Sequence, residues 1–269
     1  MKLAILLHGH MRSYEKTFSS YKKVVKKLKK QFDTCDVFLH TWDTKEPNTR
    51  TWYPIPPDAN GDVDEQEIES MYAPTKMLME RQDIKEPNKT LFGICYEGLK
   101  YSAYSAYAAN QLKEEHEKEN NFTYDIVIKM RPDVEFYSDF FIDELKESDC
   151  IWICQQFTKR SAIDVIVFSN SEAMNKICDY FKEFDSLMNN LDNISDEISG
   201  RNNEAVFDYY LNSLPETKKV SKYVMPRDWR LFRSWWPRNH QVGHRKWDRL
   251  LAIKEINQYK KYKYFRIEK

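Results

Sequence analysis

The segment MRPDVEF, residues 130–136, places three charged side chains at two-residue spacing. Arg131, Asp133 and Glu135 follow a short apolar run, and side chains two residues apart in an extended chain point to the same side. Carboxylate oxygens at one sheet edge suit Mg²⁺ or Mn²⁺, and such an ion binds a diphosphate. We therefore expect Asp133 and Glu135 as metal ligands, and Arg131 as a second contact to the anion. A surface salt bridge between Arg131 and Asp133 is the alternative.

A second candidate follows the apolar run 3–7, where the chain reads HGHMRS. Glycine allows a ligand to approach the backbone closely, and arginine binds phosphate or carboxylate groups. In open α/β sheets ligands bind beyond the carboxyl ends of the strands. We therefore expect His8, Gly9 and Arg12 to line an anion-binding pocket, with Asp43 in the same position after the next strand. A tight turn with surface side chains explains the HGHMRS segment equally well.

Two further carboxylates are candidates for acid–base chemistry. Asp164 opens the apolar segment DVIVFS, and Glu204 lies at the start of a helical pattern. A carboxylate within hydrogen-bond reach of a hydroxyl group can remove its proton once the pKa of the carboxylate is raised. The structural alternatives are that Asp164 caps a turn and that Glu204 interacts favourably with the helix dipole.

The charge of the chain is zero overall but unevenly distributed. Residues 218–269 contain 16 Lys and Arg against 4 Asp and Glu, whereas residues 1–217 contain 26 against 38. This asymmetry indicates an anionic partner, which is nucleotide phosphate, anionic lipid or nucleic acid. We expect Arg227 and His244 of the basic segment to help bind the anionic ligand.

Strand-like and helix-like patterns alternate along the chain, which predicts an α/β fold with one mainly parallel sheet. We expect strands at residues 3–7, 35–42, 77–80, 126–130, 150–154 and 164–169, the fourth of which turns polar at its C-terminal end. We expect helices at residues 14–32, 65–72, 99–118, from Ser169 or Ser171 to 191, and from Asn202 or Asn203 to 214. Residues 44–64 show no periodicity, so this segment is either a binding loop or disordered.

Several protein classes are disfavoured by the composition. The run 3–7 is too short for a signal peptide, and no stretch approaches the roughly 18 apolar residues of a membrane span. Five cysteines without paired spacing indicate reduced thiols in a reducing compartment. We expect a cytoplasmic protein that contacts the inner face of the cytoplasmic membrane at most peripherally.

Five segments in order, ILLHGHMRSYEKT, DVFLHTWD, YAPTKMLMER, YSAYSAYAAN and YDIVIKMRPDVEF, resemble bacterial glycosyltransferase-like proteins of capsule and lipopolysaccharide biosynthesis, the group that includes the WavE-like family. The resemblance covers residues 1–168. It implies a GT-A-like fold and a nucleotide-sugar donor. It also implies that Gly9 and Arg12 line the nucleotide pocket, that Asp43 lies near the base or ribose, and that Asp133 approaches the diphosphate. The chain lacks a strict D-x-D motif, which places a requirement for Mn²⁺ or Mg²⁺ in doubt.

The expected function is transfer of a sugar from a nucleotide-sugar to a hydroxyl group of a growing surface polysaccharide, with Asp164 and Glu204 on the acceptor side. Residues 1–217 would form the GT-A-like domain, and residues 218–269 a basic segment that packs on or completes it. One alternative is a non-catalytic nucleic-acid-binding module that uses the basic, aromatic C-terminal segment. Another is transfer of a phosphoryl-type or sulfo group onto a glycan.

Overall fold

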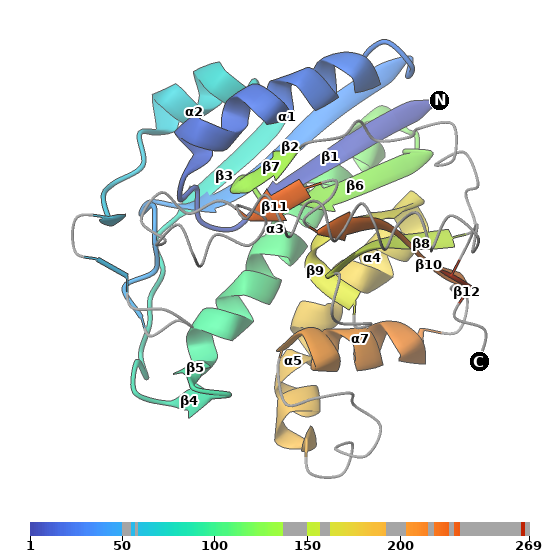
Figure 1. Ribbon diagram of the computed structural model, residues 1–269. Coiled ribbons are helices and arrows are strands. Elements are labelled where there is room, and N and C mark those ends of the chain that lie inside the picture. The colour runs from blue at the N-terminus through green and yellow to red at the C-terminus, as the bar shows by residue number, and fades with distance from the viewer. Residues whose placement is uncertain are drawn as a thin grey trace, which may run out of the picture.

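A computed structural model describes residues 1–49, 55–56, 59–136, 150–156, 162–191, 203–214, 218–225, 229–231 and 265–266 (Figure 1). Within this part of the chain the central sheet has eight strands in the order β12-β10-β8-β9-β6-β1-β2-β3. These strands are β1 (Lys2–His8), β2 (Thr34–Trp42), β3 (Lys76–Glu80), β6 (Ile126–Met130), β8 (Cys150–Gln156), β9 (Ala162–Ser169), β10 (Lys218–Met225) and β12 (Phe265–Arg266). The expected α/β fold with a mainly parallel sheet is confirmed.

The strand directions divide the sheet into two parts. β3, β2, β1 and β6 are parallel neighbours, whereas β9 is antiparallel to both β6 and β8. β10 is parallel to β8, and β12 is antiparallel to β10. Two small sheets lie outside: β7 (Val134–Phe136) pairs with β11 (Trp229–Leu231), and β4 (Thr90–Leu91) pairs with β5 (Ile94–Cys95).

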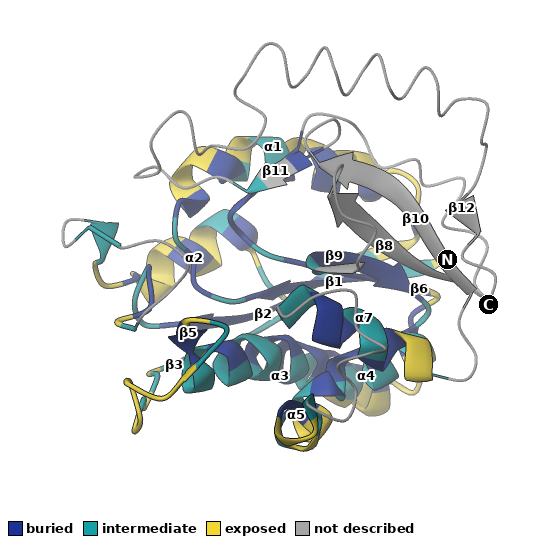
Figure 2. Ribbon diagram, turned by 60° about the horizontal axis from the view of Figure 1, so that its bottom comes forward, coloured by how far each residue is buried: buried dark blue, intermediate teal, exposed yellow. Residues whose placement is uncertain are grey.

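Helices cover both faces of the sheet (Figure 2). The helices α1 (Tyr14–Leu28) and α2 (Glu65–Tyr72) lie on one face. The other face is covered by α3 (Tyr96–Asn120), α4 (Ser171–Cys178), α5 (Tyr180–Asn189) and α7 (Asn203–Ser213). Each face has its own apolar core, and the apolar side chains that the structure describes as buried in β1, β6 and β9 belong to one or the other.

Alternation along the strands decides which core each side chain joins. In β1, Leu3, Ile5 and Leu7 pack toward α1, whereas Ala4 and Leu6 pack toward α3. The two-residue period of a strand continues this pattern, so His8 lies on the α3 side. Val127 of β6 also faces that side, which places Lys129 there as well. Two polar side chains from neighbouring strands are thus directed into one face.

The expected buried strand 126–130 is confirmed as β6, but the extended segment expected after it is interrupted. β6 ends at Met130, Pro132 and Asp133 form a turn, and the chain then enters β7, which pairs with β11 and not with the central sheet. Proline cannot donate a hydrogen bond to a neighbouring strand, so it favours such an interruption. The two-residue alternation of an extended strand therefore does not place the side chains of Asp133 and Glu135 on the same side, because the backbone between Met130 and Val134 is not extended.

Three helix boundaries also differ from the expectation. α1 ends at Leu28 and α3 is longer at both ends than residues 99–118. The predicted helix up to residue 191 is two helices, α4 and α5, which meet at Asp179. Its first residue is capped by Asn170, whose side chain accepts a 2.8 Å hydrogen bond from the Ala173 N–H, and not by Ser169 or Ser171. Asparagine is among the strongest N-cap residues, which explains the choice.

None of the described helices combines the length and the apolar composition that crossing a bilayer requires. Among the described cysteines, Cys35, Cys95 and Cys178 are free thiols. This agrees with the expectation of reduced cysteines at those three positions.

Candidate functional site

The carboxyl ends of β1 and β6 lie side by side, because Leu7 is in register with Met130. The turns after these strands consequently meet. Arg12 Nη1 lies 3.9 Å from Asp133 Oδ2, although the two residues are far apart in the sequence. The structure thus brings the two sequence-predicted segments to one edge of the sheet, while their binding roles stay predictions.

Asp133 is held by a two-pronged ion pair with Arg131. Arg131 Nε donates to Asp133 Oδ1 at 3.0 Å, and Nη2 donates to Oδ2 at 2.8 Å. The Asp133 side chain is 0% exposed, so this is a buried pair and not the surface salt bridge considered above. A planar guanidinium that binds both carboxylate oxygens fixes the orientation of both groups.

Arg12 approaches the same carboxylate from a strained turn. Its φ is +53°, and its backbone N–H donates to the Lys45 carbonyl at 2.9 Å. Its Nε lies 3.7 Å from Oε2 of the buried Glu46. Burial, followed by the charge of Arg131, lowers the pKa of Arg12 to about 9, which leaves the guanidinium charged at neutral pH. We call Arg12, Glu46, Arg131 and Asp133 the strand-end cluster.

Both guanidiniums of the strand-end cluster stay partly open. The side chain of Arg12 is 19% exposed and that of Arg131 is 17% exposed, while their carboxylate partners are almost fully covered. Arg131 uses two of its five N–H donors on Asp133. An incoming anion can therefore contact cations here without first displacing a carboxylate.

The donor set does not fit a divalent metal ion. Both oxygens of Asp133 accept hydrogen bonds from Arg131, and Glu135 lies in β7, beyond the turn. No group of three or more His, Cys, Asp or Glu side chains suitable for a metal ion exists in the part of the chain that the structure describes. Metal binding by Asp133 and Glu135 stays a prediction that requires Asp133 to exchange its arginine partner for the ion.

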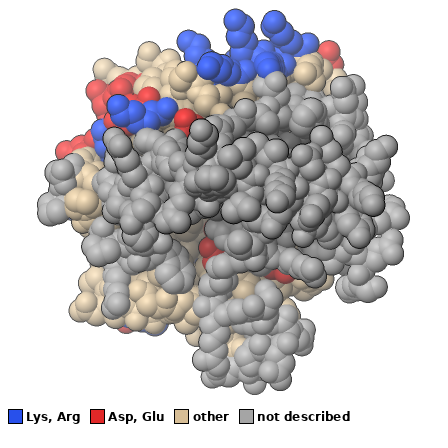
Figure 3. All heavy atoms as spheres, viewed as in Figure 1, with Lys and Arg blue, Asp and Glu red and all other residues tan. Residues whose placement is uncertain are grey.

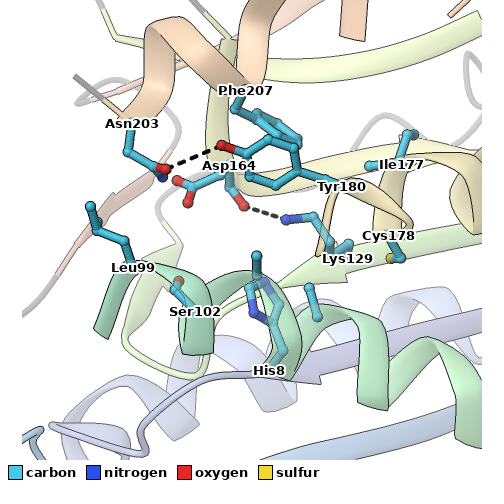
Figure 4. Close-up of a pocket in the computed structure, with 12 residues that line it drawn as sticks. His8, Leu99, Ser102, Lys129, Asp164, Ile177, Cys178, Tyr180, Asn203 and Phe207 are labelled. Carbon is cyan, nitrogen blue, oxygen red and sulfur yellow. Dashed lines mark hydrogen bonds between the residues drawn. The ribbon is translucent and has the colours of Figure 1, made fainter. Parts of the chain in front are cut away.

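Next to this cluster a pocket opens between the sheet and α3, α4, α5 and α7 (Figure 4). It encloses a cavity of about 20 Å³, which is enough for roughly one water molecule. His8 and Lys129 enter it from the sheet, and Asp164, Tyr180 and Asn203 approach from the opposite side. The remaining lining is mostly apolar.

His8 has buried ring nitrogens with no hydrogen-bond partner among the described residues. Burial, with the nearby cations Lys129 and Arg131, holds its pKa well below the usual value, so the ring is neutral at pH 7. An unpaired buried donor or acceptor costs about 1–3 kcal/mol, which a bound ligand or water recovers by pairing with it. His8 is thus a side chain prepared to receive a polar group.

Lys129 is the buried cation of this pocket. Its Nζ donates to the backbone carbonyl of Asp164 at 2.5 Å and lies 5.4 Å from the centre of the Phe207 ring. Burial lowers the pKa of Lys129, and the carboxylate of Asp164 opposes that effect. Sequence reasoning missed this residue. Its signal was a single lysine interrupting the apolar strand IVIKM.

Of the two acid–base candidates, Asp164 lines the pocket and Glu204 lies in the first turn of α7. Asp164 and Glu204 both oppose the burial effect that lowers the pKa of Arg131. Both also add to the burial effect that raises the pKa of Tyr180, whose hydroxyl group donates to Asn203 Oδ1 at 3.3 Å. Asp164 and Glu204 therefore share one electrostatic environment with the strand-end cluster, although they come from β9 and α7.

Gly9 is positioned by a buried hydrogen-bond chain. Its φ is +98°, and its N–H donates to Ser105 Oγ at 2.7 Å. Ser105 Oγ lies 2.7 Å from His40 Nδ1, and His40 Nε2 lies 2.8 Å from Glu80 Oε2. This chain fixes the turn that carries Arg12. Nothing in the sequence linked Ser105 to Gly9.

The remaining predicted residues are less central. Asp43 is half-buried after β2, where its backbone N–H donates to the Glu80 carbonyl at 2.9 Å. Glu135 is half-buried in β7. Arg227 and His244 lie outside the described residues. The structure therefore brings Arg12, Arg131 and Asp133 together after the turn at Gly9, while His8 and Asp164 line the adjoining pocket.

No protein-family model and no curated protein matches the chain. Among solved structures, the glycosyltransferase GlyE of Streptococcus pneumoniae aligns at 9% identity and a TM-score of 0.36, over 82% of this chain and 46% of that one. This chain thus spans less than half of GlyE. A glycosyltransferase involved in glycosylation of the major capsid of PBCV-1 aligns at 9% identity and a TM-score of 0.35, over 83% of each chain.

A putative glucose-1-phosphate thymidylyltransferase from Bacillus anthracis, in complex with a sucrose, aligns at 14% identity and a TM-score of 0.39, over 94% of this chain and 95% of that one. All of these likenesses fall below a TM-score of 0.5. The activities named in the titles are properties of those proteins, and the case for a function of this chain has to come from its own residues.

Proposed function

We propose that the chain is a glycosyltransferase that moves a sugar from a nucleotide-sugar donor to a hydroxyl group of a bacterial surface polysaccharide. The observation that carries the proposal is that Arg12 and Arg131 meet at the carboxyl end of the parallel strands, beside a pocket that Lys129 and Asp164 line. Glu204 lies in the first turn of α7, next in sequence to the pocket-lining Asn203. Cations from separate strand ends suit a diphosphate, and carboxylates beside them suit removal of a proton from a hydroxyl group. The five sequence segments described above support the same class.

The donor's diphosphate would bind the partly open guanidiniums. Arg12 and Arg131 supply positive charge at the place where a metal-dependent enzyme would hold its ion, and this arrangement needs no step through a metal. Hydrogen bonds between arginine and phosphate oxygens are charge-assisted, and a mostly buried site strengthens them. The nucleotide would leave carrying the electrons of the broken bond.

In the reaction, an acceptor hydroxyl oxygen forms a bond to the anomeric carbon while the bond from that carbon to the phosphate oxygen breaks. If the displacement inverts the anomeric centre, the hydroxyl proton passes to Asp164 or Glu204. The electron pair of the broken bond stays on the nucleoside diphosphate, next to Arg12 and Arg131. Replacing the true base by its amide, Asp164→Asn or Glu204→Gln, abolishes transfer while the donor still binds.

Donor binding tests the proposal directly. We expect at least one UDP, GDP, CMP or TDP compound to raise the melting temperature of the protein. We expect Arg12→Gln to weaken the binding of that compound by about 10- to 100-fold, because one charge-assisted hydrogen bond contributes about 1.5–3 kcal/mol. Isothermal titration calorimetry measures the change in the dissociation constant. The fold should survive, since the ion pairs of Arg12 are long at 3.7 and 3.9 Å.

The matched control is Arg81→Gln, which removes an exposed arginine outside the cluster and should leave binding unchanged. Repeating the titration with Mn²⁺ and with a chelator tests the metal prediction, and binding that persists in the chelator supports the arginine-based site. If no nucleotide compound changes the melting temperature under either condition, the proposal is wrong.

A further inference from the structure

The solvent side of α1 carries a dense row of lysines. Seven exposed lysines lie on this helix and its C-terminal end, and they gather on one face of the molecule in Figure 3. They are Lys16, Lys22, Lys23, Lys26, Lys27, Lys29 and Lys30. On a helical projection they share one arc, opposite to the buried residues Tyr21, Val24 and Leu28. We call these seven residues the lysine face.

Three lysines of this face, Lys22, Lys23 and Lys26, are not neutralised by acidic residues of the described part of the chain. No Asp or Glu occurs between residues 16 and 32. Glu15, just before the face, is paired with Lys45 at 2.7 Å, and Asp33, just after it, is paired with the N-terminal ammonium group. No described carboxylate lies within ion-pair distance of Lys22, Lys23 or Lys26 in the described part of the chain.

An ordinary solvated helix does not require this arrangement. Lys22 and Lys26, and likewise Lys26 and Lys30, are like charges four residues apart, and such pairs destabilise a helix. The helix dipole favours lysines only in the last turn, whereas the row begins two turns earlier. A positive surface maintained against its own repulsion indicates an anionic partner.

We propose that the lysine face docks the protein on an anionic phospholipid bilayer. The face contains lysines only, without the arginine forks or exposed aromatic rings that recognise phosphopeptides and single-stranded nucleic acid. Flexible point charges along a convex helix suit a flat, diffuse array of headgroup phosphates. Lys22 to Lys30 lie roughly 15–27 Å along α1 from Arg12, so docking through these lysines leaves the strand-end cluster open.

Vesicle sedimentation tests the inference. The full chain should pellet with vesicles of equal parts phosphatidylcholine and phosphatidylglycerol, but not with phosphatidylcholine alone. Binding should disappear near 1 M salt, where the Debye length is about 3 Å. The variant Lys22→Gln/Lys23→Gln/Lys26→Gln/Lys30→Gln should bind more than about 100-fold more weakly, since each lysine near an anionic surface contributes about fivefold. Glutamine keeps the helix propensity, so the fold is preserved.

The matched control is Lys85→Gln/Lys89→Gln/Lys118→Gln/Lys182→Gln, which removes the same charge from exposed lysines elsewhere and should bind like the wild type. The inference is overturned if the lysine-face variant and this control bind equally, if neutral vesicles bind as well as anionic ones, or if wild type binds only single-stranded RNA. These outcomes do not depend on donor binding, so they are separate from the test of the glycosyltransferase proposal.

Discussion

Two regions of the molecule bury charged groups, and they do so in opposite ways. At the strand-end cluster, Arg12 and Arg131 keep part of their surface open and some of their ion pairs are long. Between α3 and α4, Lys113 and Glu117 are covered and every partner is close. We call Lys113, Glu117, Ser171 and Asn175 the helix cluster.

The helix cluster is satisfied from within the protein. Lys113 Nζ lies 3.0 Å from Glu117 Oε2, donates to Asn175 Oδ1 at 2.8 Å and also donates to Ser171 Oγ. Glu117 Oε1 accepts from Ser171 Oγ at 2.7 Å and from the Tyr124 N–H at 2.8 Å. No exposed surface is left on the lysine side chain. Such an arrangement stabilises one packing of the helices and offers nothing to a ligand.

The difference separates a structural ion pair from a binding site. Burying charges is costly unless each is paired, and the helix cluster meets that requirement internally. In the strand-end cluster Arg12 and Arg131 keep open surface, and the neighbouring His8 lacks a partner within the described residues. A ligand can supply what is missing there. Buried charge alone therefore does not indicate function, whereas buried charge with open donors does.

The largest effect should come from breaking the helix cluster. Lys113→Met leaves the Glu117 carboxylate buried without its cation, which should lower the free energy of unfolding by about 3–5 kcal/mol in urea titrations. Adding Glu117→Gln removes the unpaired charge but keeps an acceptor for Ser171, so the double variant should recover at least half of the loss. A double variant as unstable as the single one would show that the helix cluster acts by shape and not by charge.

Acid should lower the free energy of unfolding, because two buried histidines, His8 and His10, lie next to the strand-end cluster. Burial keeps the pKa of His10 at about 3 and that of His8 well below its usual value, so both rings are neutral when folded. The unfolded chain takes up these protons below about pH 6.5, and stability present above that pH is lost as pH falls. We expect a loss of about 2–3 kcal/mol between about pH 7.5 and about pH 5.5.

Denaturant titrations at the two pH values measure this loss. The variant His8→Leu should reduce it, because His8 no longer takes up a proton on unfolding, whereas His10 and His40, whose pKa values burial also lowers, still do. A stability that does not change between these pH values contradicts the assignment of neutral, buried rings to the folded state.

The smallest effect concerns the turn that carries Arg12. Gly9→Ala should cost about 1–2 kcal/mol, because φ is +98° there although no atom would crowd the new Cβ. Gly61→Ala also adds a methyl group in open space, but without a positive φ, and should change stability by less than about 0.5 kcal/mol. Thermal unfolding of the two variants compares them. Equal melting temperatures would mean that the Gly9 turn is not strained.

The amino-acid sequence by itself determined the elements and their class. Apolar runs with two-residue or three- to four-residue periods specify β1, α1, β2 and β6, because burial of one side of each element depends only on local spacing. The strand ends also marked Gly9, Arg12 and Asp133 as a candidate site. The sequence also showed the lysines of α1. It did not show that the flanking carboxylates of Glu15 and Asp33 form ion pairs with other groups.

Only the tertiary structure decided which charges meet. The approach of Arg12 to Asp133, the hydrogen bond from Lys129 to the Asp164 carbonyl, and the link from Gly9 to Ser105 each depend on contacts between residues that periodicity does not relate. The metal prediction assumed an extended segment in which the side chains of Asp133 and Glu135 point to the same side, and the turn at Pro132 interrupts that segment. Side-chain pairing depends on three-dimensional distances, and these are fixed by the order and direction of strands in the sheet.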